Sequence, residues 1–185
     1  AAWELKKSFM RHLFTYGPVL VAEAEKVPLK ETEIGPVPEH WEVVRLGELG
    51  EIITGTTPST KVAEYYGGPH MFITPGDIYQ TKYITQTQKY LSNKGLSVSR
   101  PLPCDTVLVV CIGATLGKTA MTSIDNGVTN QQINSIITSQ RIEPHYCFYA
   151  TTHYSNLLTA LAGRVAIPIV NRTQATKFLI PLPPI

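Results

Sequence analysis

The sequence predicts one helix followed by a domain of short β-strands and loops with few further helices. Between residues 2 and 16, apolar side chains recur at three- and four-residue spacing, which is the period of an α-helix. From Trp41 onward, short apolar stretches roughly alternate with polar residues and are separated by turns rich in Gly, Thr and Pro. Because 43% of the 185 residues are hydrophobic and 16% are charged, the composition indicates a folded globular protein.

The first helix has a wide apolar face for its length. It is predicted to end at Gly17 and Pro18, which are common helix stop signals. We expect a helix outside this sequence to cover the face, rather than the body of the domain. Since the chain starts at Ala1 inside the helical pattern, we expect it to be a fragment of a longer protein. The apolar positions are Ala2, Trp3, Leu5, Phe9, Met10, Leu13, Phe14 and Tyr16.

The remaining elements follow from local patterns. Residues 18–40 contain four prolines and seven charges and are predicted to form an extended linker. A helix is predicted from Glu143 to Leu161, with Pro144 in its first turn and Gly163 as its stop signal. Residues 178–185 should be extended, and their prolines exclude a central position in a sheet. Strands are predicted at residues 41–46, 51–54, 71–74, 83–85, 106–112, 118–122 and 133–138.

No arrangement typical of an enzyme or metal site is present in the sequence. The five histidines are scattered, and there is no H-E-x-x-H motif. Asp77 follows Pro75 and Gly76, which is typical of a turn or helix-cap aspartate rather than of a catalytic carboxylate. The three cysteines form no C-x-x-C pair, which favours reduced thiols in a cytoplasmic protein. Because no signal peptide or membrane-spanning apolar run is found, no membrane partner is expected.

The charges are distributed unevenly along the chain. Residues 1–51 carry six Lys or Arg against nine Asp or Glu, a balance of −3. Residues 52–185 carry ten against five, a balance of +5, which gives the overall charge of +2. We therefore expect an anionic partner to bind the second part.

Residues 112–119, Ile-Gly-Ala-Thr-Leu-Gly-Lys-Thr, come close to a phosphate-binding loop. Such a loop needs four residues between its first glycine and the Gly-Lys pair, so that successive N–H groups wrap a phosphate. Only three residues separate Gly113 from Gly117, and Ile112 stands where the first glycine should be. This argues against nucleotide binding, but an enzyme built on residues 113–119 is one alternative. The segment favours a buried strand and a tight turn, from which Lys118 either approaches a phosphate or is simply solvated.

A polar segment from Thr129 to Ser135 follows the glycine turn. Amide side chains and a loop lysine suit the recognition of base edges and phosphates better than catalysis. If the segment is extended, Asn130, Gln132 and Asn134 should share one face. A further alternative is a sugar- or peptide-binding module with a groove lined by Tyr65, Tyr66, Tyr79 and Tyr83.

In their order and spacing, several motifs resemble the specificity (S) subunit of Type I restriction-modification systems. Residues 13–17 are similar to the end of the long spacer helix that separates the two target-recognition domains of that family, and residues 38–49 to the entry into such a domain. The resemblance extends from Ala2 to Ile185 and implies the second recognition domain with part of the preceding spacer. The other matching segments are residues 55–59, 65–68, 73–78, 102–111, 113–118, 129–132 (Thr-Asn-Gln-Gln) and 180–184 (Ile-Pro-Leu-Pro-Pro).

The resemblance implies an α+β fold with a strongly curved, mostly antiparallel sheet and a few helices, similar to the recognition domains of adenine DNA methyltransferases. It implies the end of the spacer helix at residues 1–17, a linker at 18–40 and a target-recognition domain at 41–185. The function would be to read one half of a bipartite site in double-stranded DNA, without catalysis. The partners would be methyltransferase (M) subunits and, through them, the restriction (R) subunit. S-adenosylmethionine, ATP and Mg²⁺ would belong to those partners, and no cofactor to this chain.

We expect DNA contacts from loops at residues 56–61, 79–83 and 164–172 and from the glycine turn. The resemblance is strongest at residues 129–131, and a segment shared by domains that read different targets does not specify any one of them. We therefore expect a structural role for these three residues. The candidate DNA-binding residues are Thr56, Thr57, Ser59, Lys61, Lys82, Lys118, Arg164, Asn171 and Arg172.

Overall fold

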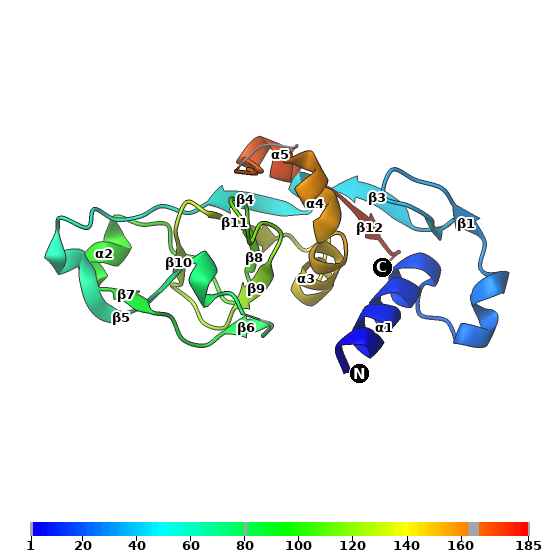
Figure 1. Cartoon of the computed structure of the whole chain (residues 1–185), viewed down its shortest axis with the longest axis horizontal. Helices are drawn as coiled ribbons and strands as arrows, with labels where there is room; N and C mark the ends of the chain where they lie inside the picture. Colours follow the sequence, from blue (N-terminus) through cyan, green and yellow to red (C-terminus); the bar gives the residue numbers. More distant parts are fainter. Residues whose placement is uncertain (1, 80, 163–166, 185) are drawn as a thin grey trace.

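The computed structural model describes residues 2–79, 81–162 and 167–184 (Figure 1). The molecule is elongated, with helix α1 (Ala2–Tyr16) near one end and helix α2 (Asn93–Ser97) with strands β5 (Tyr66–Ile73) and β7 (Lys89–Leu91) at the other. Most strand pairs are antiparallel and the helices are few, so the predicted α+β class is confirmed. Within the described residues the strands are divided among four sheets.

Helix α1 has the predicted bounds and ends at Gly17, whose φ of +80° is readily adopted by glycine. Its two apolar sides differ. The ring of Phe14 is buried and lies stacked on His153, with centroids 4.9 Å apart, and edge-on to Tyr154. The other side is exposed, and the expectation that an outside helix covers it stays a prediction. The exposed apolar residues of α1 are Trp3, Leu5, Phe9 and Leu13.

Residues 18–40 contain more structure than the linker prediction allowed. A 3₁₀ helix covers Val21–Lys26, and strands β1 (Leu29–Lys30) and β2 (Val37–Pro38) pair antiparallel. The turn between the strands is closed by a hydrogen bond from the Thr32 hydroxyl to the Gly35 carbonyl, 2.6 Å long. Because each strand is only two residues long, periodicity could not reveal it.

A five-stranded sheet forms the centre of the domain, with the order β4-β11-β8-β9-β6. All neighbours are antiparallel except β6 and β9, which are parallel. Five of the predicted strands correspond to these elements, with ends shifted by at most two residues. Their bounds are β4 Gly50–Thr54, β6 Tyr83–Ile84, β8 Val107–Val110, β9 Thr119–Thr122 and β11 Ile133–Thr138.

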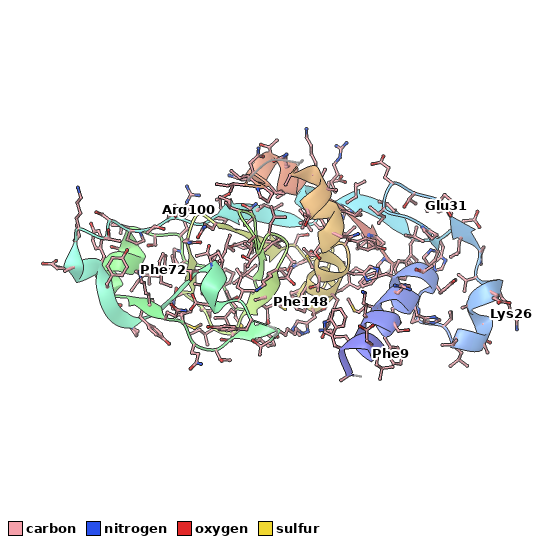
Figure 2. The ribbon with its side chains drawn as sticks, in the orientation of Figure 1. Phe9, Lys26, Glu31, Phe72, Arg100 and Phe148 are labelled. Atoms are coloured by element: carbon pink, nitrogen blue, oxygen red, sulfur yellow. The ribbon has the colours of Figure 1, made fainter. Side chains whose placement is uncertain are left out.

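Strand β8 is buried on both faces, which explains its continuous apolar sequence. Val107 and Val109 belong to the core on the side of helix α3 (Pro144–His153), which also contains Phe148 of that helix (Figure 2). Leu108 and Val110 belong to the core on the opposite side. The sheet therefore lies between two apolar layers, and its connecting turns lie at the surface.

Two smaller sheets flank the centre. One has the order β10-β5-β7, in which β10 (Val128–Thr129) is parallel to β5. The other pairs β12 (Leu179–Leu182) with β3 (Glu42–Arg45). Pro181 lies in this two-stranded sheet, so its predicted exclusion from a central strand is confirmed. Short 3₁₀ helices cover Leu46–Glu48, Ala63–Tyr65 and Pro75–Asp77.

The helix predicted at residues 143–161 is interrupted. It forms α3 and α4 (Ser155–Leu161), with Tyr154 between them at φ −91° and ψ 12°. The Tyr154 ring is buried against Phe14, which fixes the bend. Gly163, the predicted stop signal, lies outside the described residues. Helix α5 (Arg172–Thr176) was not predicted, because its five residues are too few to show a helical period.

We predict that Phe14→Ala lowers the free energy of unfolding of this chain by about 3–5 kcal/mol, because it removes a buried ring from the contact of α1 with α3. The control is Phe9→Ala on the same helix, whose ring is 56% exposed and whose loss should cost less than about 0.5 kcal/mol. Urea unfolding measures both. Equal losses would contradict the assignment of the two faces.

Candidate functional site

The turn between β10 and β11 is held by its own asparagine. The Asn130 Oδ1 atom accepts a hydrogen bond from the Gln132 backbone N–H at 3.1 Å, and its Nδ2 atom donates to the Gln132 Oε1 atom at 3.0 Å. The Asn130 backbone N–H donates to the Ile73 carbonyl of β5. Residues 130–132 are thus a turn rather than a strand, and only Asn134 lies in β11. The conditional expectation of one shared amide face is wrong, because the chain reverses at Asn130.

The loop after β4 lies directly against this turn. The backbone N–H of Gly55 donates to the Ile133 carbonyl, and that of Thr56 donates to the Thr129 carbonyl at 2.9 Å. A side chain at position 55 would overlap the carbonyl oxygens of Thr129 and Asn130, so the close approach requires glycine. Thr57 donates its hydroxyl to the Oε1 atom of Gln131. The turn therefore positions residues 55–57 at the surface.

Among the loop candidates, Thr57, Ser59 and Lys61 are exposed. The hydroxyl of Thr56 is buried and has no hydrogen-bond partner among the described residues, so it faces inward. Sequence reasoning missed Arg100, which is exposed and donates from Nη1 to the Thr54 carbonyl at 3.1 Å (Figure 2). Nothing in the local sequence of Arg100 indicated its proximity to a loop about 45 residues earlier.

Four N–H groups of the glycine turn are used in hydrogen bonds within the fold. The Gly113 N–H donates to the Pro168 carbonyl, and the Gly117 N–H donates to the Val110 carbonyl. The N–H groups of Leu116 and Lys118 donate within the turn, to the carbonyls of Gly113 and Thr115. Both glycines have φ near +85°, and Gly117 packs against the start of α4. Since a phosphate-binding loop needs free, convergent N–H groups, the nucleotide-enzyme alternative is not supported. Lys118 itself is exposed.

Asn171 and Arg172 lie beside this turn. The Val170 N–H donates to the Cys111 carbonyl, immediately before the glycine turn. Asn171 caps α5, because its Oδ1 atom accepts a hydrogen bond from the Gln174 N–H at 2.9 Å. Arg172 is exposed in the first turn of the helix. Arg164, the remaining candidate of this loop, lies outside the described residues.

Lys82 is separated from the other candidates. Its ammonium group lies 5.2 Å from the ring centre of Tyr83 and 5.3 Å from that of Tyr149 on α3. The Tyr83 hydroxyl donates to Asp105 at 2.9 Å and bonds His145 at 2.8 Å. Burial, followed by the Asp105 hydrogen bond, raises the pKa of Tyr83 to about 12. The structure therefore places Lys82 on aromatic rings at the β6 edge rather than beside residues 56–61 at the opposite edge strand.

The carboxylates of the basic part are engaged within the fold. Asp77 is buried and accepts hydrogen bonds from Thr74 and from the Gln88 N–H, so its predicted role as a cap is confirmed. Glu64 pairs with Lys94. The Asp105 carboxylate accepts a hydrogen bond from the Tyr83 hydroxyl. The Asp125 carboxylate accepts from the Cys104 N–H, and the Glu143 carboxylate accepts from the Tyr146 N–H. By contrast, several exposed cations form no ion pair with another described residue: Lys61, Lys89, Arg100, Lys118, Arg172 and Lys177.

Other kinds of site receive little support. The described residues contain no group of three or more His, Cys, Asp or Glu placed to hold a metal ion. None of the helices among them has both the length and the apolar character needed to cross a bilayer. The Tyr66 hydroxyl donates to the Pro58 carbonyl and that of Tyr83 to Asp105, so two of the four tyrosines proposed to line a groove are committed to loop packing.

Comparison with known proteins identifies relatives of this arrangement. Residues 38–185 match the family model described as the Type I restriction modification DNA specificity domain. The chain is 31% identical over 160 residues to the specificity subunit of the Type I restriction enzyme MjaIX of Methanocaldococcus jannaschii, covering 83% of this chain and 37% of that subunit. It is 44% identical over 103 residues to the HindI specificity subunit of Haemophilus influenzae, covering 55% of this chain and 22% of that protein. The chain thus spans well under half of either relative.

Solved structures share the fold. The HsdS subunit from Thermoanaerobacter tengcongensis aligns with a TM-score of 0.62 at 19% identity, over 98% of this chain and 40% of that one. A chain from a structure concerned with complex assembly and conformational transition of the type I R-M system aligns with a TM-score of 0.67 at 19% identity, over 98% and 42%.

We predict that Asn130→Ala lowers the free energy of unfolding by about 1–3 kcal/mol, because the turn loses both side-chain hydrogen bonds and the Gln132 N–H loses its acceptor. Gln131→Ala is the matched control, since this neighbouring amide is exposed and contacts only the Thr57 hydroxyl by hydrogen bond. Thermal or urea unfolding distinguishes them. A stable Asn130→Ala protein would remove the structural role assigned to the turn.

Proposed function

We propose, because the chain belongs to the Type I restriction modification DNA specificity domain family, that it reads one half of a bipartite DNA sequence. The family match over residues 38–185 carries the proposal, since that range includes the central sheet, the 130–132 turn and the loops around it. The exposed cations of this part support it, because phosphate contacts supply much of the affinity of a protein for DNA.

In this function the chain supplies specificity and no chemistry. The carboxylates of residues 52–185 are used as caps and hydrogen-bond acceptors, as expected of a binding domain. S-adenosylmethionine, ATP and Mg²⁺ would be bound by partner subunits that methylate and cleave the DNA. The exposed apolar side of α1 would face a helix of the longer parent protein. The domain boundaries at residues 17 and 40 are part of this proposal.

The candidate contacts divide into two groups. Thr57, Ser59 and Lys61 lie on one exposed loop, which Arg100 adjoins. Lys118 ends the glycine turn, and Arg172 begins α5 after the segment that is hydrogen-bonded to Cys111 and Gly113. Lys and Arg side chains of this kind neutralise phosphates, whereas base edges require donors and acceptors at fixed positions. Lys82 is a weaker candidate, because its ammonium group is held over aromatic rings.

The direct test is the methylated sequence. The adenines methylated in cells that carry the complete parent system should include a bipartite motif that is absent when the parent gene is deleted. Exchanging residues 41–185 for the corresponding domain of a relative should change one half of that motif and leave the other half intact. A motif that stays the same after the exchange would refute the proposed function.

We predict that the isolated chain binds DNA weakly and with little sequence preference at physiological salt. A surplus of five positive charges in residues 52–185 permits only a few phosphate contacts, and each contributes close to one unit of salt slope. Binding of target and scrambled duplexes, followed by fluorescence anisotropy, measures this. Tight and selective binding by the isolated chain would contradict the prediction.

We predict that Lys118→Ala in the complete enzyme weakens binding to all sequences alike and lowers the salt slope by about one. The matched control is Lys26→Ala, an exposed lysine on the first 3₁₀ helix, remote from the glycine turn (Figure 2). Titrations at several salt concentrations provide the slopes. An unchanged slope would mean that Lys118 is only solvated.

A further inference from the structure

One end of the molecule is a small lobe formed by residues 60–73 and 87–100, which we call the ribbon lobe. It consists of the antiparallel ribbon β5–β7, helix α2 and the 3₁₀ helix Ala63–Tyr65, at the left end of Figure 1. Phe72, Leu91 and Val128 form its own buried cluster, with Tyr66 packed against it. This cluster packs the ribbon against α2 and β10, and Met71 and Ile73 of β5 join it to one core of the central sheet.

The ribbon carries an open groove of about 640 Å³. At one end, Gly67 has φ +81°, and a Cβ atom there would meet nothing within 4 Å, so the backbone is open to an approaching surface. The pairing of β5 with β7 shifts register between Tyr66 and His70, so the ladder is irregular beside the groove. The groove is lined by Thr60, Tyr66, Gly67, Gly68, Gln88, Lys89 and Tyr90.

The backbone on the β7 side of the groove is fixed by internal hydrogen bonds. The Thr87 N–H donates to the Tyr90 hydroxyl at 3.3 Å, and the Thr87 hydroxyl donates to the Lys89 carbonyl at 2.7 Å. The Gln88 N–H donates to the buried carboxylate of Asp77 at 2.9 Å. These bonds hold the positions of Gln88 and Lys89 without using their side chains.

The side chains of Gln88 and Lys89 are exposed and form no hydrogen bond or ion pair with another described residue. Tyr66, by contrast, donates its hydroxyl to the Pro58 carbonyl, and Tyr90 accepts from Thr87. The groove thus presents one amide and one ammonium group on a fixed backbone, which is the arrangement a binding surface needs.

Shape and charge favour DNA as the occupant. The major groove of B-DNA admits a two-stranded β-ribbon, and glutamine pairs bidentately with the N6 and N7 atoms of adenine. In residues 60–73 and 87–100 there are four Lys or Arg against one acidic residue, Glu64, and Asp77 lies beside the ribbon. Glu64 is paired with Lys94 and Asp77 is buried, so the surface of the lobe is positive.

We propose that the ribbon lobe enters the major groove, that Gln88 reads a base there and that Lys89 contacts a phosphate. This inference rests on the proposed function of DNA recognition and identifies the element that carries it out. Gln88 is a specificity-determining residue, and Lys89 contributes affinity without sequence preference.

The experiment uses the complete enzyme with Gln88→Ala or Lys89→Ala, and with Gln140→Ala and Lys26→Ala as exposed amide and lysine controls. Binding is measured on the target and on duplexes with single base changes, together with the methylated sequence in cells. Gln88→Ala should reduce discrimination at one position about 5- to 150-fold and relax the methylated motif there. Lys89→Ala should weaken all duplexes alike and lower the salt slope by about one. The controls should change neither.

Two failures are distinguishable. If Gln88→Ala keeps full discrimination at every position while the unchanged enzyme still selects its target, the ribbon inference is wrong and the proposed function stands. If the unchanged enzyme shows no sequence preference, the proposed function itself fails. Because neither side chain forms a hydrogen bond or ion pair with another described residue, thermal unfolding of both variants should match that of the unchanged enzyme. A large loss of stability would overturn the free exposure on which the inference depends.

Discussion

The hydrogen bonds of the turn at residues 130–132 determine how the ribbon lobe is attached to the central sheet. Asn130 donates its N–H to Ile73 at the end of β5, and the Gln132 carbonyl accepts from Cys111 at the end of β8. The same turn receives the N–H of Thr56 through the Thr129 carbonyl. Three segments distant in sequence therefore meet at one reversal of the chain. Because the amide groups of the turn are used in these hydrogen bonds and in bonds between Asn130 and Gln132, they stabilise the fold more than they offer groups for recognition.

The central sheet provides the rigid base for that turn. Strand β8 buries alternate side chains in two different cores, so a shift in its register would exchange the residues of both. Each fully buried Val or Leu contributes about 1.5–3 kcal/mol, which makes such a shift costly. The polar turns at the ends of β8 and β11 are thereby held in place, although they contain few apolar groups themselves. The turn that attaches the ribbon lobe therefore rests on strands that are held by their apolar cores.

Local sequence patterns predicted most of the long elements and missed most of the short ones. Helix α1 and four of the five central strands could be predicted because their periods extend over several residues, and β6 was predicted although it has only two. Strands β7 and β10 have only two or three residues and exist because β5 lies between them. The bend at Tyr154 depends on the ring of Phe14, about 140 residues earlier in the chain, so no local pattern could predict it.

The sequence could predict a candidate site residue only where the residue type alone indicates its role. The loop after β4 and Lys118 could be identified as polar and exposed, but Arg100 and Gln88 acquire their positions from contacts with Thr54 and Asp77. Lys82 shows the opposite case, since its charge suggested DNA contact while its neighbours are aromatic rings. The side chains of Gln88 and Lys89 form no hydrogen bond or ion pair with another described residue, so substituting them should leave the hydrogen bonds of their backbone intact. Under the proposed function, such a domain can change the sequence it recognises with little cost to its stability, because the groups proposed to face DNA are separate from those that hold the turn.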